Sequence, residues 1–166
     1  MRKIHAVTLI LGAVVAGIAN SATTTTTFAV TSTLLATCSA TATPLAFSAY
    51  TPGGGAVANN STINVKCTKN TPFTVALNGG STAGGTVAQR LMAFGANTLQ
   101  YNLYTSGAFT TVFGDGSGAS KTEAGTGAGI ATASAFTVFG QLPDNATNQA
   151  AVPGSYTDTI TVTVTY

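Results

Sequence analysis

The C-terminal segment Tyr156–Tyr166 has the sequence YTDTITVTVTY, in which threonine alternates with other residues. Successive side chains of a β-strand point to opposite faces, so the alternation predicts a strand with one threonine face. The other face carries Ile160, Val162, Val164 and Tyr166. Exposed strand edges usually carry charges, proline or bulges, and Thr159–Tyr166 has none of these. Such an edge is either prone to aggregation or built to receive another strand.

A second alternating segment lies near the N-terminus and is the natural candidate for that partner strand. Phe28, Val30, Ser32 and Leu34 share one face, and Thr27, Ala29, Thr31 and Thr33 share the other. If Thr25–Leu35 folds back on its own domain, the molecule is a closed monomer. If it reaches into a neighbour, a head-to-tail polymer grows. The alternation alone does not decide between the two.

Composition favours β structure in a single domain. Only 6% of residues are charged against 45% hydrophobic, whereas ordinary domains have about 25% charged residues. The chain has 32 threonines and 19 glycines, and few of the Lys and Glu residues that fill helix surfaces. Predicted strands, in the pattern of an antiparallel sandwich, are Thr25–Leu35, Leu45–Tyr50, Thr62–Cys67, Phe73–Leu77, Arg90–Phe94, Leu99–Thr105, Ala108–Phe113, Phe136–Gln141 and Ser155–Tyr166. Asn78-Gly79 predicts a tight reversal, and Gly114–Gly129 predicts a surface loop.

Residues 1–21 predict an export signal that is cleaved after Ser21, or alternatively after Ala19. Arg2 and Lys3 precede an apolar run, and small residues follow it. We expect an N-terminal extension over residues 22–37 and one domain over 38–166. Beyond residue 21 the four basic and four acidic residues balance, and no basic cluster occurs. Nucleic acid is therefore not an expected partner.

Cys38 and Cys67 are the two cysteines of the chain. In an exported protein they predict one disulfide, which would stabilise the fold by about 3.5 kcal/mol. A catalytic or metal-binding pair is the weaker interpretation, because the spacing is long and no histidine follows residue 21.

The residues needed for catalysis are scarce, so we do not expect an enzyme, a metal or a cofactor. No histidine remains to activate a nucleophile, and the acids Asp115, Glu123 and Asp144 lie in predicted loops. The stretch GDGSGASK, 114–121, lacks the spacing of a phosphate-binding loop or the carboxylates of a calcium loop. Tyr101 and Tyr104 could form a sugar-stacking platform, although packing within the sheets is the better interpretation.

The order of several short motifs is similar to one known family. They are Phe28, Val30 and Leu34 before Cys38; Leu45-Ala46-Phe47 and Tyr50; Lys66-Cys67-Thr68; Arg90-Leu91-Met92; Leu99–Tyr104; Val112–Gly116; Val138–Pro143; and Gly154–Asp158 leading to Tyr166. From Phe28 to Tyr166 the chain resembles the spore coat protein U domain family, which includes the major pilins of archaic chaperone-usher pili. One departure is Phe113, where relatives often carry tryptophan.

The resemblance implies an all-β fold, an incomplete immunoglobulin-like sandwich that lacks its final strand and is completed by donor-strand exchange. Phe28, Val30, Ser32 and Leu34 would form the donor strand, and Ile160, Val162, Val164 and Tyr166 would form the edge of the acceptor groove. The implied partners are other copies of the chain, a periplasmic chaperone and an outer-membrane usher. The implied function is that of a structural subunit of extracellular pili used in attachment and biofilm formation. The alternative is a monomeric secreted binding module, for example for carbohydrates.

Overall fold

The computed structural model describes residues 17 and 20–166, so most of the predicted export signal lies outside the described residues. The chain divides into two units, residues 1–33 and 34–166. In the described part of the first unit, residues 20–33 are exposed and have no regular secondary structure. Residues 20–33 thus carry alternating polar and apolar side chains but form no strand.

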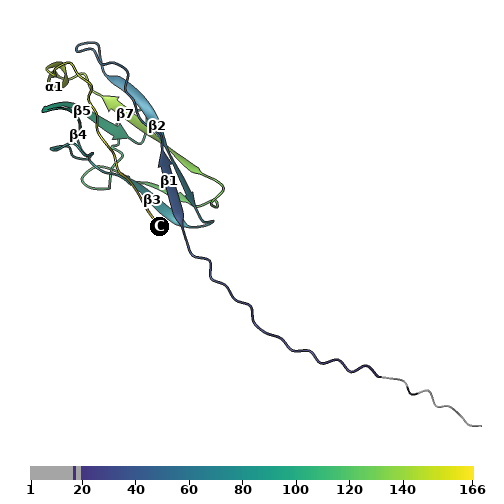
Figure 1. Cartoon of the computed structure of the whole chain (residues 1–166). Helices are drawn as coiled ribbons and strands as arrows, with labels where there is room; N and C mark the ends of the chain where they lie inside the picture. The colour runs from purple at the N-terminus through teal and green to yellow at the C-terminus, as the bar shows by residue number, and fades with distance from the viewer. Residues whose placement is uncertain (1–16, 18–19) are drawn as a thin grey trace, which may run out of the picture. The chain divides into compact units, whose positions relative to one another are not determined.

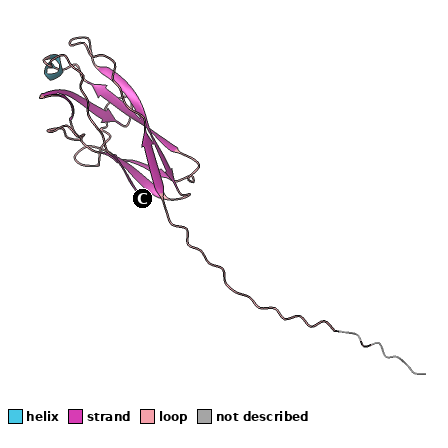
Figure 2. Ribbon diagram, in the orientation of Figure 1, coloured by secondary structure: helices cyan, strands magenta, loops and turns pink. Residues whose placement is uncertain are grey.

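The second unit is an antiparallel β-sandwich of two sheets (Figures 1 and 2). The larger sheet has the order β1 (Cys38–Ala42), β2 (Val57–Cys67), β7 (Ser134–Leu142), β5 (Asn97–Tyr104) and β4 (Arg90–Phe94). The smaller sheet has the order β6 (Glu123–Thr126), β3 (Pro72–Leu77) and β8 (Val162–Thr165). One short helix, α1 (Ala146–Gln149), follows β7. The predicted all-β sandwich is confirmed.

The core lies between the two sheets and is built from alternate residues of their strands. On β2, Ile63, Val65 and Cys67 are buried, and the residues between them are more exposed. Phe73 of β3 packs edge-to-face against Phe136 of β7, with ring centroids 5.9 Å apart. Further core residues are Val75, Leu77, Tyr101, Leu103, Phe113 and Val138. Alternation along the sequence therefore places these apolar faces against each other.

One charged residue, Arg90, is fully buried between the sheets. Its guanidinium group donates to the carbonyl oxygen of Asn78 (2.9 Å), the side-chain oxygen of Asn102 (2.6 Å) and the carbonyl oxygen of Phe113 (2.9 Å). A buried charge is tolerated only when its hydrogen-bonding capacity is used. Arg90 therefore ties the end of β3 to β5 and to the segment that follows β5.

Most predicted strands are confirmed, and the exceptions share a cause. Thr62–Cys67, Phe73–Leu77, Arg90–Phe94, Leu99–Thr105 and Phe136–Gln141 correspond to β2, β3, β4, β5 and β7. Of the predicted strand Ser155–Tyr166, only Val162–Thr165 is a strand, β8, because the preceding residues cross from the larger sheet to the smaller one. Leu45–Tyr50 and Thr25–Leu35 are not strands, because neither pairs with a strand among the described residues. Ala108–Phe113 forms only isolated bridges, Tyr104 to Val112 and Phe113 to Lys121.

Two further expectations were wrong. Asn78-Gly79 does not make a tight hairpin, because β3 and β4 belong to different sheets and residues 78–89 form a longer connection between them. The predicted loop Gly114–Gly129 contains a strand, β6, which pairs with β3. Its sequence EAGT has no apolar alternation, so its partner and not its own pattern makes it a strand.

Candidate functional site

The sandwich contains an open cavity of about 1010 Å³ between its two sheets. Its floor is apolar and includes Ile63, Leu77, Leu103 and Val138, which belong to four different strands. One side is formed by residues 42–50, and the other by residues 151–160 together with Val162. Both sheets therefore contribute to a single cavity that opens along the edge of the sandwich.

The wall formed by residues 42–50 begins at the end of β1, where Thr43 still donates a backbone hydrogen bond to Thr62 at 3.0 Å, and beyond Thr43 it pairs with no strand in the part of the chain that the structure describes. Leu45 and Phe47 are half-buried and line the cavity, while Ala46 between them is exposed. The side-chain amide of Asn59 donates to the carbonyl oxygen of Ala46 at 2.6 Å and ties the segment to β2. A side chain at Gly140 of β7 would clash, because its Cβ would lie 2.7 Å from Leu45 and 3.0 Å from Phe47. Glycine there lets this wall cross β7 closely.

The opposite wall crosses from one sheet to the other. Thr157 exchanges two backbone hydrogen bonds with Ala93, at 2.9 and 3.0 Å, and so begins beside β4 of the larger sheet. Four residues later Thr161 accepts a bond from the backbone of Asn78 and donates one to its side chain. From Val162 the chain continues as β8, paired with β3 of the smaller sheet. The wall is therefore anchored to both sheets.

Asp158 fixes the position at which this wall crosses between the sheets. One carboxylate oxygen accepts hydrogen bonds from the backbone and hydroxyl groups of both Ser81 and Thr82, at 2.9 to 3.1 Å. The other accepts the hydroxyl of Tyr101 at 2.7 Å. Burial by itself raises the pKa of Asp158, but these hydrogen bonds outweigh it and leave the pKa below its usual value. The charged carboxylate thus joins β5, the 78–89 connection and the cavity wall.

Gly80 allows the carboxylate of Asp158 to approach the backbone. Its φ angle is +94°, and a Cβ there would lie 2.0 Å from the carboxylate. Tyr101 is buried, and its pKa is raised chiefly by this burial and further by the hydrogen bond that its hydroxyl donates to Asp158. The preferred interpretation, packing within the sheets, is therefore confirmed for Tyr101, which belongs to the core.

The backbone of β8 has one paired and one open edge. Asn78 and Thr161 form a hydrogen-bonded pair, and such pairs alternate along an antiparallel ladder. Thr161, Thr163 and Thr165 therefore turn their backbone groups towards β3. It follows that Ile160, Val162 and Val164 turn theirs the other way, where no strand lies among the described residues. These are also the residues whose side chains point inwards.

A second carboxylate, Asp144, holds the end of the 42–50 wall and the turn that follows it. It accepts hydrogen bonds from the hydroxyl of Tyr50 (2.5 Å), the backbone of Gly53 (3.1 Å) and Gly55 (2.9 Å), and the amide of Gln149 (3.1 Å). These bonds, with that from Tyr50 the largest, lower the pKa of Asp144 to about 2. Burial and the bond to Asp144 raise the pKa of Tyr50 to about 12. The turn after the 42–50 wall is thus fixed to the start of α1.

The predicted groove-edge residues differ in their positions. Ile160 and Val162 line the cavity. Val164 is half-buried and packs against the core, and Tyr166 is 58% exposed beyond the end of β8. The predicted donor residues Phe28, Val30 and Leu34 are 84 to 88% exposed, and Ser32 is exposed as well. The roles of both sets, and the domain boundary at residue 38, stay predictions.

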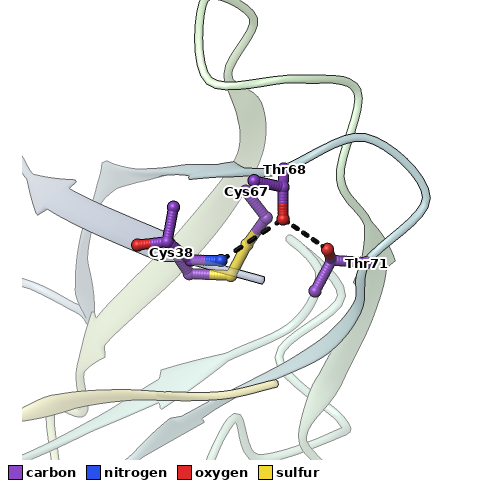
Figure 3. The surroundings of a disulfide bond; sticks show 5 residues. Cys38, Cys67, Thr68 and Thr71 are labelled. Carbon is purple, nitrogen blue, oxygen red and sulfur yellow. Dashed lines mark hydrogen bonds between the residues drawn. A yellow bond between two sulfur atoms is a disulfide. The ribbon is translucent and has the colours of Figure 1, made fainter. Parts of the chain in front are cut away.

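The predicted disulfide is confirmed: Cys38 and Cys67 are bonded (Figure 3). They face each other as the first pair of the β1–β2 ladder. The side chains of Thr68 and Thr71 lie beside them, with their hydroxyl oxygens 2.6 Å apart. The crosslink therefore fixes the start of β1 to the end of β2.

The acidic side chains that could support a metal site or catalysis lie apart from one another in the described residues. Among the described residues, no three His, Cys, Asp or Glu side chains gather in a way that could hold a metal. Asp115 accepts bonds from Ser117 and Ser120 of its own loop, and the Ser117 bonds are the main reason that its pKa is lowered. Within residues 17 and 20–166, no helix has the length and apolar character needed to cross a membrane.

Comparison with known proteins agrees with this architecture. The family model of the Spore Coat Protein U domain matches residues 24–163. A structural neighbour is a chain in the crystal structure of the CsuC–CsuE chaperone–tip adhesion subunit pre-assembly complex from archaic chaperone-usher Csu pili of Acinetobacter baumannii. The two share 22% identity with a TM-score of 0.58, and the match covers 81% of this chain and 41% of the other. A search of curated proteins gives no match.

Proposed function

The chain belongs to the Spore Coat Protein U domain family, and on that basis we propose that it is a structural subunit of an archaic chaperone-usher pilus. Subunits polymerise when the N-terminal segment of one copy fills the cavity of the next. The fibre reaches the cell surface and serves attachment and biofilm formation. The fold similarity to a subunit complex of Csu pili supports the same class of assembly.

The cavity is the observation that carries this proposal. It is open along one side and apolar at its floor, and it is bordered by a strand whose backbone groups are unpaired on the cavity side. An apolar floor that is left open to water in this way is unfavourable, and covering it stabilises the subunit. An added strand would satisfy the backbone of Ile160 and Val162 and cover the floor with its side chains.

The N-terminal segment has the pattern that such a strand needs. Phe28, Val30 and Leu34 are apolar on one face, and each would contribute about 1.5 to 3 kcal/mol on full burial. Ser32 is the weakest of the four inward positions because its side chain is small and polar. The threonines on the other face favour an extended backbone and would remain in contact with water. The segment is therefore suited to donate a strand.

The same cavity explains the need for helper proteins before assembly. A periplasmic chaperone would lend a strand to each subunit and keep the apolar floor covered. An outer-membrane usher would then exchange the lent strand for the segment of the next subunit. With a high barrier to unfolding, the product is kinetically stable even without covalent links between copies. The subunits therefore travel through the periplasm and end in an extracellular fibre.

Deleting residues 22–35 tests the proposal directly. Cells that express the full chain with its chaperone and usher should show fibres by electron microscopy, and cells that express the deleted chain should show none. The deleted chain should still be recovered with the chaperone, because its cavity is intact. A synthetic peptide of residues 22–36 should bind the deleted chain, whereas the same peptide with Val30→Asp should not. Fibres of normal number from the deleted chain would refute the proposal.

A further inference from the structure

The start of β1 is held at two consecutive residues. Cys38 is bonded covalently to Cys67. Thr37 is held by Thr68 in both directions: its backbone N–H donates to the Thr68 hydroxyl at 3.3 Å, and its carbonyl accepts the Thr68 N–H at 3.0 Å. The Thr68 hydroxyl also contacts that of Thr71 (Figure 3). We call Thr37, Cys38, Cys67 and Thr68 the root latch.

The root latch lies next to the segment that would donate a strand. Only Leu35 and Ala36 separate Leu34, the last apolar donor position, from Thr37. A chain that reversed at this point to run back along β1 would need its turn at Leu35-Ala36. Tight reversals between antiparallel strands require positive φ angles and favour Asn-Gly or Asp-Gly. Leu and Ala are poor residues for such a turn.

The distance from the root latch to the cavity raises a second obstacle. The cavity lining begins at Ala42, the last residue of β1. Four residues along a strand span about 13 Å. If the segment turned back at the latch, its last residues, including Leu34, would lie alongside β1 and outside the cavity. Fewer apolar side chains would then reach the cavity of the same subunit.

Without such obstacles, a subunit would fill its own cavity. A short tether gives a local concentration of about 1 mM, whereas subunits meet one another at much lower concentrations. Self-filling would therefore win over polymerisation and produce a closed monomer. We propose that the root latch prevents the segment from filling its own cavity and so directs it to a second copy of the chain. This inference rests on the proposed function and identifies what selects the partner.

An insertion between Ala36 and Thr37 tests the latch without breaking it. The sequence Gly-Asn-Gly-Ser-Gly supplies turn residues and a reach of about 17 Å, enough to pass β1. The matched control carries the same insertion between Gly118 and Ala119, in an exposed loop away from the cavity. Each chain is produced with its own chaperone and usher, and heat-labile oligomers are separated from monomers by electrophoresis without boiling.

The expected result is at least about a tenfold rise in the monomer-to-polymer ratio for the root insertion, and no change for the loop insertion. The monomers should protect residues 22–35 from protease, because the segment then lies in its own cavity. An unchanged ratio, or monomers whose segment is digested, would overturn the inference. The Cys38→Ser, Cys67→Ser variant, tested with the same protease, should also produce protected monomers if it folds.

The wild-type chain separates this inference from the proposed function. If wild-type chain forms polymers and the root insertion changes nothing, only the latch inference fails. If the wild-type chain forms no polymers and its own segment is already protected, the pilus proposal itself fails.

Discussion

Asp144 shows how one side chain organises a turn that the sequence leaves undefined. The residues before β2 include three consecutive glycines, Gly53 to Gly55, and backbone entropy would favour disorder there. Two of these glycines and Tyr50 donate to the same carboxylate. The sequence analysis placed Asp144 only in a loop, and the structure adds that it fixes a turn that lies 89 to 94 positions earlier in the chain.

This contact predicts a pH dependence of stability. The pKa of Asp144 is about 2 in the folded chain, against about 3.9 in an unfolded chain. A carboxyl group with a lowered folded pKa stabilises fully above the unfolded value and loses this effect as the pH falls towards the folded value. Asp144→Asn should therefore lower the urea midpoint at pH 6 and have progressively less effect from pH 4 to pH 2. A constant difference between variant and wild type across this range would contradict the assignment.

Val30 tests the donor strand at the scale of one residue. Val30→Asp would place an unpaired carboxylate in the apolar cavity of the next subunit, at a cost far above that of an exposed charge. We expect fibres to be lost, while the variant is still recovered as a folded complex with the chaperone. Thr31→Asp is the matched control, because position 31 lies on the other face of the segment and should leave fibre formation nearly unchanged. Equal effects of the two substitutions would exclude the predicted alternation.

At the scale of elements, the disulfide is the main covalent constraint of the fold. It joins residues 29 positions apart and closes the loop that contains the 42–50 wall and β2. In the chain-entropy account this constraint contributes about 3.5 kcal/mol. The double variant Cys38→Ser, Cys67→Ser should lower the free energy of unfolding by about that amount in urea titrations. A loss within the error of the titration would show that the crosslink has little effect on stability.

Strand prediction succeeded where a segment carries its own pattern. β2, β3, β5, β7 and β8 alternate or are continuously apolar, and these features are local. β1 and β6 have the sequences CSATA and EAGT and become strands because a long-range partner presents an open edge. Leu45–Tyr50 shows the converse: its side chains alternate, but no strand lies beside it to complete a ladder. Alternation therefore predicts burial better than it predicts pairing.

The candidate site was partly predictable for the same reason. Ile160 and Val162 follow from alternation, and they line the cavity. The polar groups that hold the cavity walls do not follow from it, because Asp158 acts on a connection 76 residues earlier in the sequence. Arg90 is also beyond local analysis, since only the fold brings Asn78, Asn102 and Phe113 around its guanidinium group.

For the whole molecule, the near absence of charge predicts how assembly responds to salt. Beyond residue 21 the chain has four basic and four acidic residues, and Arg90, Asp144 and Asp158 are all engaged within the fold. Salt screens exposed charges and strengthens apolar burial at most modestly. Fibre yield and strand-exchange rate should therefore change less than about threefold between 0.05 and 0.5 M NaCl. Light scattering measures both quantities. A tenfold or larger change in fibre yield or exchange rate over this salt range would indicate that charge governs assembly.

The position of the crosslink also determines how a fibre would respond to load. A force applied through the residues before Thr37 acts on β1 at the first residue pair of the β1–β2 ladder. In a ladder without a crosslink, force at the first pair would break the hydrogen bonds one at a time. Here that first pair is the covalent one, Cys38 with Cys67. The force passes directly into the longest strand of the larger sheet, β2, where many bonds must be sheared together.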